Sequence, residues 1–201
     1  MSGFGDTPAG PLGSDQMIIT ISGPHGTGKS TYAARLAREL GLRHVSAGLL
    51  FRRLADEKRV SLEVFGQLAL EDPAIDRHVD EETMKEAEKG DVVVDGQLAG
   101  WVLREVADLR VCLTAPETVR MERIAKRDRV SLEEARKHTF QRESVQSERY
   151  RRHYGFKVED LSLYHMVIDT DLLSQEDTAR VLLTAALAVK SRKHEMRSKK
   201  P

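Results

Sequence analysis

The chain has 201 residues, of which 40% are hydrophobic, and its 32 acidic side chains balance its 32 Lys and Arg side chains. This composition excludes a disordered chain, which needs low hydrophobicity and high net charge, and it allows one compact domain with a sizeable core. A single cysteine excludes an intramolecular disulfide, and no apolar segment approaches the roughly 20 residues that span a bilayer. We therefore expect a soluble protein of a reducing, cytoplasmic compartment; we also expect a monomer, although nothing in the composition bears on the oligomeric state.

The two ends of the chain differ in composition from the rest. Residues 1–16, MSGFGDTPAGPLGSDQ, are rich in Gly, Pro and Ser and lack the basic start and apolar stretch of a signal peptide. We interpret them as a flexible leader, and the segment GPLGS within it resembles the scar of a cleavable expression tag. Residues 191–201 are basic and are expected to be a disordered tail, so residues 17–190 are predicted to form a single domain.

Apolar runs and helical periodicity alternate along this domain. Residues 17–22, MIITIS, predict a parallel strand that is covered on both faces, and a helix is expected over 29–40. The elements expected after these are strands at 43–45, 91–96, 109–115 and 165–170, and helices at 47–59, 61–70, 73–90 and 174–190. Strands that alternate with helices predict an α/β fold, with a five-stranded parallel sheet and right-handed crossovers.

The first strand runs into the segment SGPHGTGKST, which fits the pattern GxxxxGK[ST]. Backbone amides of such a loop, with the positive end of the following helix, suit the phosphates of ATP. We assign phosphate binding to Gly23, Pro24, His25, Gly26, Thr27, Gly28, Lys29, Ser30 and Thr31. Lys29 is expected to bridge the β- and γ-phosphates and Ser30 to bind Mg²⁺, whereas His25 occupies a variable position and receives no catalytic role. A glycine-rich turn that matches by chance is the alternative.

A second candidate for metal binding follows the predicted strand DVVVDG. Asp95 comes after three consecutive valines, at the carboxyl edge of the expected sheet. A carboxylate there can hold a water molecule of the Mg²⁺ shell. The alternative is a turn or helix-capping aspartate before Gly96.

The charged residues are unevenly distributed. Residues 71–91 hold nine acids against three bases, and we interpret the acidic stretch DEETMKEAEKGD within them, residues 80–91, as a solvated helix face. Residues 120–157 hold twelve bases against six acids. Transfer of a phosphoryl group to a second phosphate needs cations but no base, because the attacking oxygen is already anionic. Arg142 and Arg149 lie two turns apart on one helix face and Arg52 lies on the helix after the second strand, so these three are candidate phosphate ligands.

Several segments together resemble the archaeal-type cytidylate kinases, a branch of the nucleoside monophosphate kinases. They are ISGPHGTGKSTYAARLARELGLRHVSAGLLFRRLA, EDPAID, GQLAGW, LTAPETVRMERIAKRD, RESVQSERYRRHYG and LYHMVIDT. The likeness, over about residues 17–170, implies a P-loop kinase fold with an acceptor-binding helical region at about 46–90 and a small helical lid at about 123–155. It also implies that ATP phosphorylates CMP or dCMP in the presence of Mg²⁺. By the same likeness Arg52 grips the acceptor phosphate, and Arg142 and Arg149 bridge donor and acceptor.

Two positions depart from the relatives. Gln97 stands where related kinases commonly carry arginine. A neutral amide can bind a base or a phosphate but cannot neutralise charge, so either acceptor affinity is lower or a cation such as Arg104 substitutes. Ala47 replaces a hydroxyl residue of bacterial relatives, which leaves Ser46 as the expected contact. Ser46 and Gln97 are therefore candidate substrate ligands.

Two other functions are compatible with these patterns. The same scaffold could phosphorylate another nucleoside monophosphate, as an adenylate kinase does, or a phosphorylated metabolite. A nucleotide-dependent switch protein that binds RNA or a ribosomal partner would instead use the basic segment as a nucleic-acid surface. Aromatic side chains are scarce there and acids are interleaved with the bases, so we expect no nucleic-acid partner.

Overall fold

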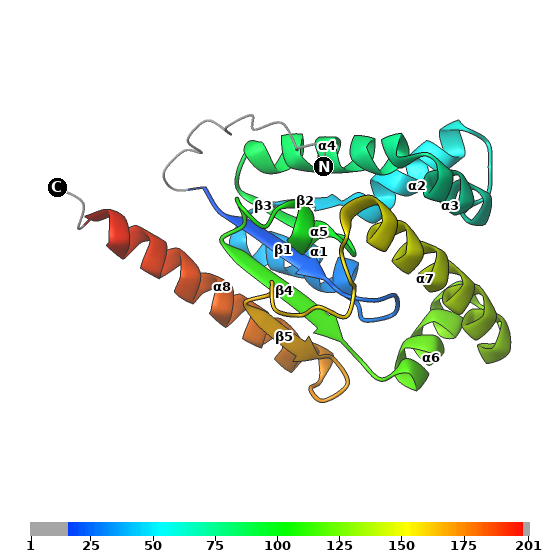
Figure 1. Ribbon diagram of the computed structural model, residues 1–201. Helices are drawn as coiled ribbons and strands as arrows, with labels where there is room; N and C mark the ends of the chain where they lie inside the picture. The colour runs from blue at the N-terminus through cyan, green and yellow to red at the C-terminus, as the bar shows by residue number, and fades with distance from the viewer. Residues whose placement is uncertain (1–15, 199–201) are drawn as a thin grey trace.

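The computed structural model describes residues 16–198 of the chain (Figure 1). Its centre is a parallel sheet whose five strands lie in the order β2-β3-β1-β4-β5. The strands are β1 Ile18–Ser22, β2 Arg43–Ser46, β3 Val92–Asp95, β4 Leu109–Thr114 and β5 Met166–Asp169. The predicted five-stranded parallel sheet is therefore confirmed, while residues 1–15 of the leader expected at 1–16 lie outside the described residues.

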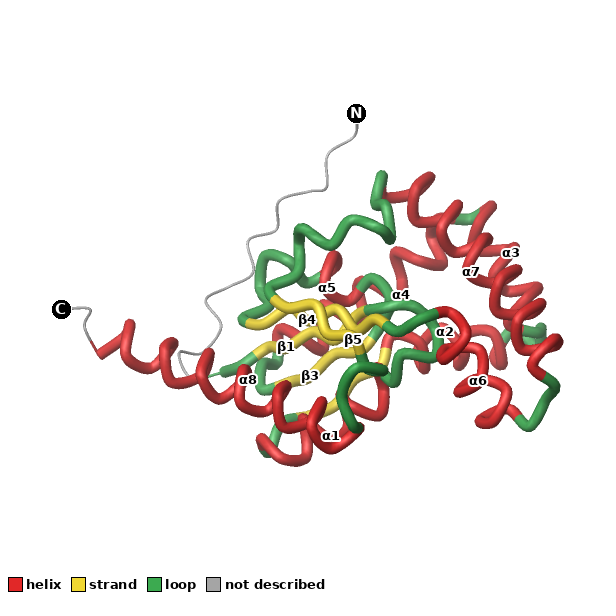
Figure 2. The backbone as a smooth tube through the Cα atoms, turned by 90° about the horizontal axis from the view of Figure 1, so that it is seen from below, coloured by secondary structure: helices red, strands yellow, loops and turns green. Residues whose placement is uncertain are grey.

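Helices cover both faces of this sheet (Figures 1 and 2). On one face, apolar side chains of α1 Lys29–Leu40 and α8 Gln175–Ser198 pack against β1, β4 and β5. On the other face, α4 Pro73–Glu88 and α5 Ala99–Val102 pack against β1 and β3. The strands in the middle are thus buried from both sides, which explains why they read as continuous apolar runs.

The strand registers bring the carboxyl ends of three strands to one edge of the sheet. All five residues of β1 are buried, and β1 lies between β3 and β4. Asp95 at the end of β3 pairs with Ile21 of β1 on one side and with Ser46 of β2 on the other. The loop after β1 therefore begins beside the carboxylate of Asp95, at the edge where open parallel sheets bind ligands.

Two groups of helices extend beyond this edge. The first group follows β2 and consists of α2 Ala47–Glu57, α3 Leu62–Glu71 and α4. The second group follows β4 and consists of α6 Glu117–Asp128 and α7 Leu132–Tyr154. The helix α7 starts with a capping box between Ser131 and Glu134, and it packs against α3 and α6 (Figure 1).

The last helix is longer than the sequence predicted. The helix α8 continues to Ser198, so the expectation of a disordered tail is wrong for residues 191–198. Lys193 explains part of this order, since its Nζ atom lies 2.6 Å from Asp108 Oδ1 and donates to the backbone oxygen of Gln16. Residues 199–201 lie outside the described residues. Among residues 16–198, no helix is long and apolar enough to cross a membrane.

Candidate active site

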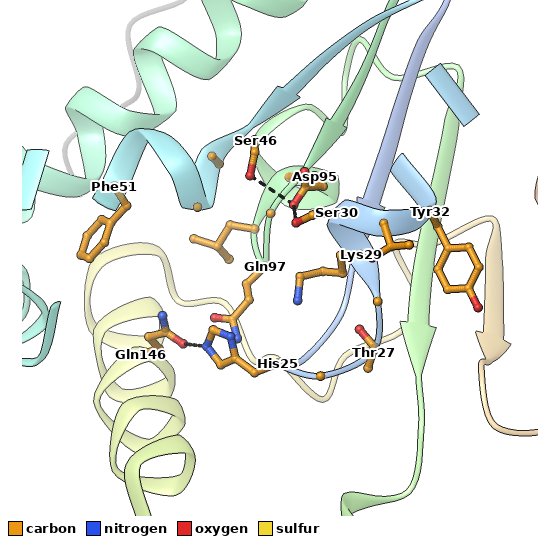
Figure 3. A pocket seen from close by; sticks show the side chains of 18 of the residues that line it. His25, Thr27, Lys29, Ser30, Tyr32, Ser46, Phe51, Asp95, Gln97 and Gln146 are labelled. Carbon is orange, nitrogen blue, oxygen red and sulfur yellow. Dashed lines mark hydrogen bonds between the residues drawn. The ribbon is translucent and has the colours of Figure 1, made fainter. Parts of the chain in front are cut away.

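A cleft of about 770 Å³ opens at the carboxyl edge of the sheet, between the loop after β1 and the two groups of helices (Figure 3). Thirteen of the residues proposed from the sequence line it. They are His25, Gly26, Thr27, Gly28, Lys29, Ser30, Thr31, Ser46, Arg52, Asp95, Gln97, Arg142 and Arg149. The fold thus brings the phosphate-binding motif and the candidate acceptor ligands to a single cavity.

Gly23 and Pro24, the two other predicted loop residues, shape the loop from outside the lining of the cleft. Gly23 has φ 136°, and a Cβ atom on it would lie 2.1 Å from the backbone oxygen of Leu113, so only glycine fits. The backbone oxygen of Pro24 accepts hydrogen bonds from Thr27 Oγ1 at 2.9 Å and from Lys29 Nζ at 2.9 Å. These bonds hold the loop in one conformation.

The ammonium group of Lys29 points into the cleft (Figure 3). Desolvation lowers the pKa of Lys29 to about 8, although the charges of Asp95 and Glu143 oppose this shift. A desolvated ammonium group interacts strongly with an anion that enters the cleft, because little water competes for it. Its position therefore suits phosphate binding.

Asp95 is the centre of a buried hydrogen-bond cluster. Its side chain, in a residue that is 3% exposed, accepts from Ser30 Oγ at 2.8 Å and from Ser46 Oγ at 3.3 Å. His44 Nε2 lies 2.7 Å from the other carboxylate oxygen of Asp95. No sequence pattern predicted His44 at this position, whereas Ser30 and Asp95 were both predicted as metal ligands and do lie together. Ser46 has a second contact, since its hydroxyl caps α2 by accepting from Leu49 N.

Five arginines line the cleft: the three predicted as phosphate ligands come from α2 and α7, and the other two, Arg123 and Arg127, lie on α6. Arg52 on α2 and Arg142 on α7 have no carboxylate within 4.0 Å among the described residues. Burial lowers the pKa of Arg142, and the nearby charge of Arg52 lowers it further. Cations that are close together and lack counter-ions favour the binding of an anion between them.

Arg149, the third arginine, is buried and is 2% exposed. Its Nε atom lies 2.9 Å from Asp76 Oδ2, and its guanidinium carbon lies 4.8 Å from the centre of the Phe51 ring. Despite the short distance to Asp76, neither Nε nor Nη1 of Arg149 completes a hydrogen bond. Buried donors without acceptors are rare and costly, so this guanidinium group is suited to an additional anionic partner.

The acidic stretch on α4 is only partly a solvated face. Glu81 is exposed, as predicted, whereas Asp76, one turn before the stretch predicted to be solvated, is 5% exposed and contacts both Arg149 and His153. The prediction of a solvated face is wrong for Asp80, which accepts a hydrogen bond of 2.6 Å from Tyr154 Oη. The signal that sequence reasoning missed is the helical spacing of positions 76 and 80 around the buried Val79.

Gln97 lines the cleft, but the proposed substitute cation does not reach it. Tyr150 Oη donates to Gln97 Oε1 at 3.2 Å. The guanidinium group of Arg104 lies 4.5 Å above the ring of Trp101 and donates to the Trp101 backbone oxygen. Of the two alternatives for Gln97, substitution by Arg104 is therefore wrong, and the arginines that do line the cleft lie on α2, α6 and α7.

Asp80 should make the stability of the fold depend on pH. Burial raises the pKa of Asp80 from 3.8 to about 7, and the neighbouring charge of Asp76 acts in the same direction. The folded protein then holds the proton more tightly than the unfolded chain does. This tighter binding of the proton stabilises the fold fully below pH 3.8, the pKa of Asp80 in the unfolded chain. The stabilisation is lost as the pH rises to about 7, the pKa in the folded protein.

Asp80→Asn removes this ionisation and keeps an acceptor for Tyr154. We expect the variant to gain stability relative to the natural chain as the pH rises between about 4 and 7, because only the natural chain must keep a proton on a buried carboxyl group. Urea unfolding of both proteins across this range measures the difference. A difference that does not change with pH would contradict the prediction.

Comparison with known proteins agrees with this geometry. The model of the Cytidylate kinase-like family matches residues 18–172. A cytidylate kinase of Aeropyrum pernix is 47% identical over 166 residues, which are 83% of this chain and 96% of that protein. One of Ignicoccus hospitalis is 48% identical over 159 residues, which are 79% and 92% of the two chains.

Solved structures with the same fold are more distant in sequence. A shikimate kinase of Acinetobacter baumannii in complex with shikimate has a TM-score of 0.55 and 16% identity, over 87% of this chain and 95% of that one. An uncharacterised protein of Eubacterium ventriosum has a TM-score of 0.64 and 17% identity, over 85% and 98%. These structures support the P-loop kinase fold alone. The match of the family model and the identity to the archaeal proteins show that the chain belongs to the cytidylate kinase-like family.

Proposed function

We propose that the protein transfers the γ-phosphoryl group of ATP to the phosphate of CMP or dCMP. One observation carries the proposal: a phosphate-binding loop and three arginines from two other helices face each other across a single cleft. Such a cleft suits two anions better than one, since the loop can hold the donor and the arginines can hold the acceptor. The names of the archaeal relatives support cytidylate as the acceptor.

On the donor side, the loop amides and Lys29 would hold the phosphates. Ser30 Oγ and the carboxylate of Asp95, which are 2.8 Å apart, are oxygen ligands of the kind that Mg²⁺ prefers, so these residues fit the ion. Bound Mg²⁺ would neutralise charge on the transferring phosphoryl group. Within residues 16–198 there is no group of three His, Cys, Asp or Glu side chains that could hold a metal by itself.

On the acceptor side, Arg52, Arg142 and Arg149 would orient the CMP phosphate toward the γ-phosphate. The buried donors of Arg149 that complete no hydrogen bond support a phosphate oxygen as their partner. An acceptor phosphate is already anionic, so the reaction needs positioning and charge neutralisation and no general base. Residues of about 46–90 would form the acceptor-binding region and those of about 123–155 the lid, in a protein that works as a monomer.

A panel of acceptors tests the proposal. The purified protein is mixed with ATP, Mg²⁺ and, in turn, CMP, dCMP, UMP, AMP and GMP, and the diphosphate products are quantified. We expect the highest kcat/KM with CMP or dCMP. Preference for AMP would favour an adenylate kinase, and release of phosphate without any diphosphate product would favour a hydrolytic switch.

Arg52→Ala separates the acceptor side from the donor side. We expect the KM for CMP to rise by more than about tenfold, because a charge-assisted contact contributes roughly 1.5 kcal/mol or more, while the affinity for ATP changes little. Arg53→Ala is the matched control, since Arg53 is exposed on the same helix and does not line the cleft. Equal losses for ATP and CMP would contradict the assignment of Arg52.

A further inference from the structure

His25 in the phosphate loop is held from three sides by helices of the proposed lid segment. Its backbone N–H donates to Glu143 Oε1 at 3.1 Å, and its backbone oxygen accepts from Arg120 Nη1 at 2.9 Å. Its ring atom Nε2 lies 2.8 Å from Gln146 Oε1 (Figure 3). Arg120 and Glu143 also pair with each other at 2.7 Å, so the backbone N–H and the backbone oxygen of His25 both bind to members of one ion pair.

The ring of His25 is uncharged in this position. Burial and the charges of Arg142 and Lys29 lower the pKa of His25 to about 2. With the carbonyl oxygen of Gln146 facing Nε2, the neutral ring donates from this atom. The contact with Gln146 is thus a hydrogen bond between neutral groups, and it adds no charge to a site that must hold two phosphates.

The same helix is attached to the acceptor side of the cleft. Within α7, Arg149 contacts Asp76 of α4 and Tyr154 donates to Asp80 of α4. Arg142 lies on α7 next to Glu143, one turn before Gln146. Because a helix is a rigid element, contacts at Glu143 and Gln146 determine where the guanidinium group of Arg142 stands relative to the loop.

We propose that His25 is a positioning residue, which docks α7 on the phosphate loop and thereby fixes Arg142 between the donor and acceptor phosphates. This inference rests on the proposed kinase function and adds a specific coupling to it. The loop motif requires no particular residue at position 25, so the role comes from the surroundings of the side chain and not from the motif. When the contact between His25 and α7 is lost, water should attack the γ-phosphate more often before the acceptor phosphate does.

The variants His25→Ala, Gln146→Ala and their double variant test the coupling. Each single variant should lower kcat for CDP formation about tenfold, while the KM for ATP changes less than about threefold. The double variant should also lose about tenfold and not about a hundredfold, because both changes remove the same contact. Each should raise the ratio of ADP formed to CDP formed. In His25→Gln an amide donor replaces the ring, and turnover should recover to within about threefold of the natural chain.

His138→Ala is the matched control on the same helix. His138 is exposed and lies away from the loop, 3.4 Å from Glu63 of α3, so its loss should leave the ratio of ADP to CDP unchanged. Normal CDP turnover in both single variants, or losses that multiply in the double variant, would overturn the coupling. Failure of the proposed function looks different, since the natural chain itself would then make no CDP.

Discussion

Lys29→Ala is expected to lower kcat for CDP formation by about 10³-fold or more, while the free energy of unfolding stays the same or rises. In the proposed reaction Lys29 presents a charge to the transferring phosphoryl group, and no other side chain of the loop carries a positive charge that could replace it. Its removal should not destabilise the fold below about pH 8, because burial lowers the pKa of Lys29 from 10.5 to about 8 and the ammonium form is held less tightly in the folded state. We expect Asp95 to keep its contacts with Ser30, Ser46 and His44 in the variant, because none of these contacts involves Lys29.

Two further variants separate charge from packing in this experiment. Lys29→Met keeps most of the side-chain volume and should lose as much turnover as Lys29→Ala. Lys126→Ala removes an exposed lysine of α6, which does not line the cleft, and should have the turnover of the natural chain. Steady-state kinetics measures kcat, and urea unfolding measures the free energy of unfolding. If a folded Lys29→Ala protein turned over within about tenfold of the natural chain, the assignment of this loop as the binding site of the donor phosphates would be contradicted.

The sheet could be predicted because its signals are local. The strands β1 and β3 are mostly apolar runs whose every residue is buried, and α1, the helix after β1, is capped by Gly41, whose φ is 69°. The end of α8 could not be predicted in this way. Residues 191–198 are rich in charge and look like a solvated tail, and their order depends in part on the pairing of Lys193 with Asp108, which lies far away in the sequence.

The position of the proposed donor half of the site was predictable for the same reason, and that of the proposed acceptor half only in part. The loop residues and Asp95 follow strands directly, so the fold of the sheet places them together. The buried positions of Asp76 and Asp80 depend instead on how α7 packs against α4, which no local pattern contains. The role of His44 beside Asp95 likewise comes from the pairing of β2 with β3.

Arg149→Ala is expected to lower kcat for CMP phosphorylation by about 10²-fold or more, with smaller changes in the affinities for ATP and CMP. The proposed role of Arg149 is to neutralise charge that spreads between donor and acceptor, so its loss should appear in turnover. The structure adds a second consequence. Removing one partner of a buried ion pair leaves the carboxylate of Asp76 without its cation, and such a change commonly costs about 3–5 kcal/mol of stability.

These two consequences can be separated by the double variant Arg149→Ala/Asp76→Asn. It removes both charges, so most of the lost stability should return, whereas turnover should stay low because no cation reaches the phosphates. Arg149→Lys keeps a charge but not the planar guanidinium group, and we expect it to fall between the natural chain and Arg149→Ala in turnover. Urea unfolding and single-turnover kinetics on the same preparations give both readouts. If kcat recovered together with stability in the double variant, Arg149 would be a structural residue that holds α7 on α4, and the catalytic assignment would be wrong.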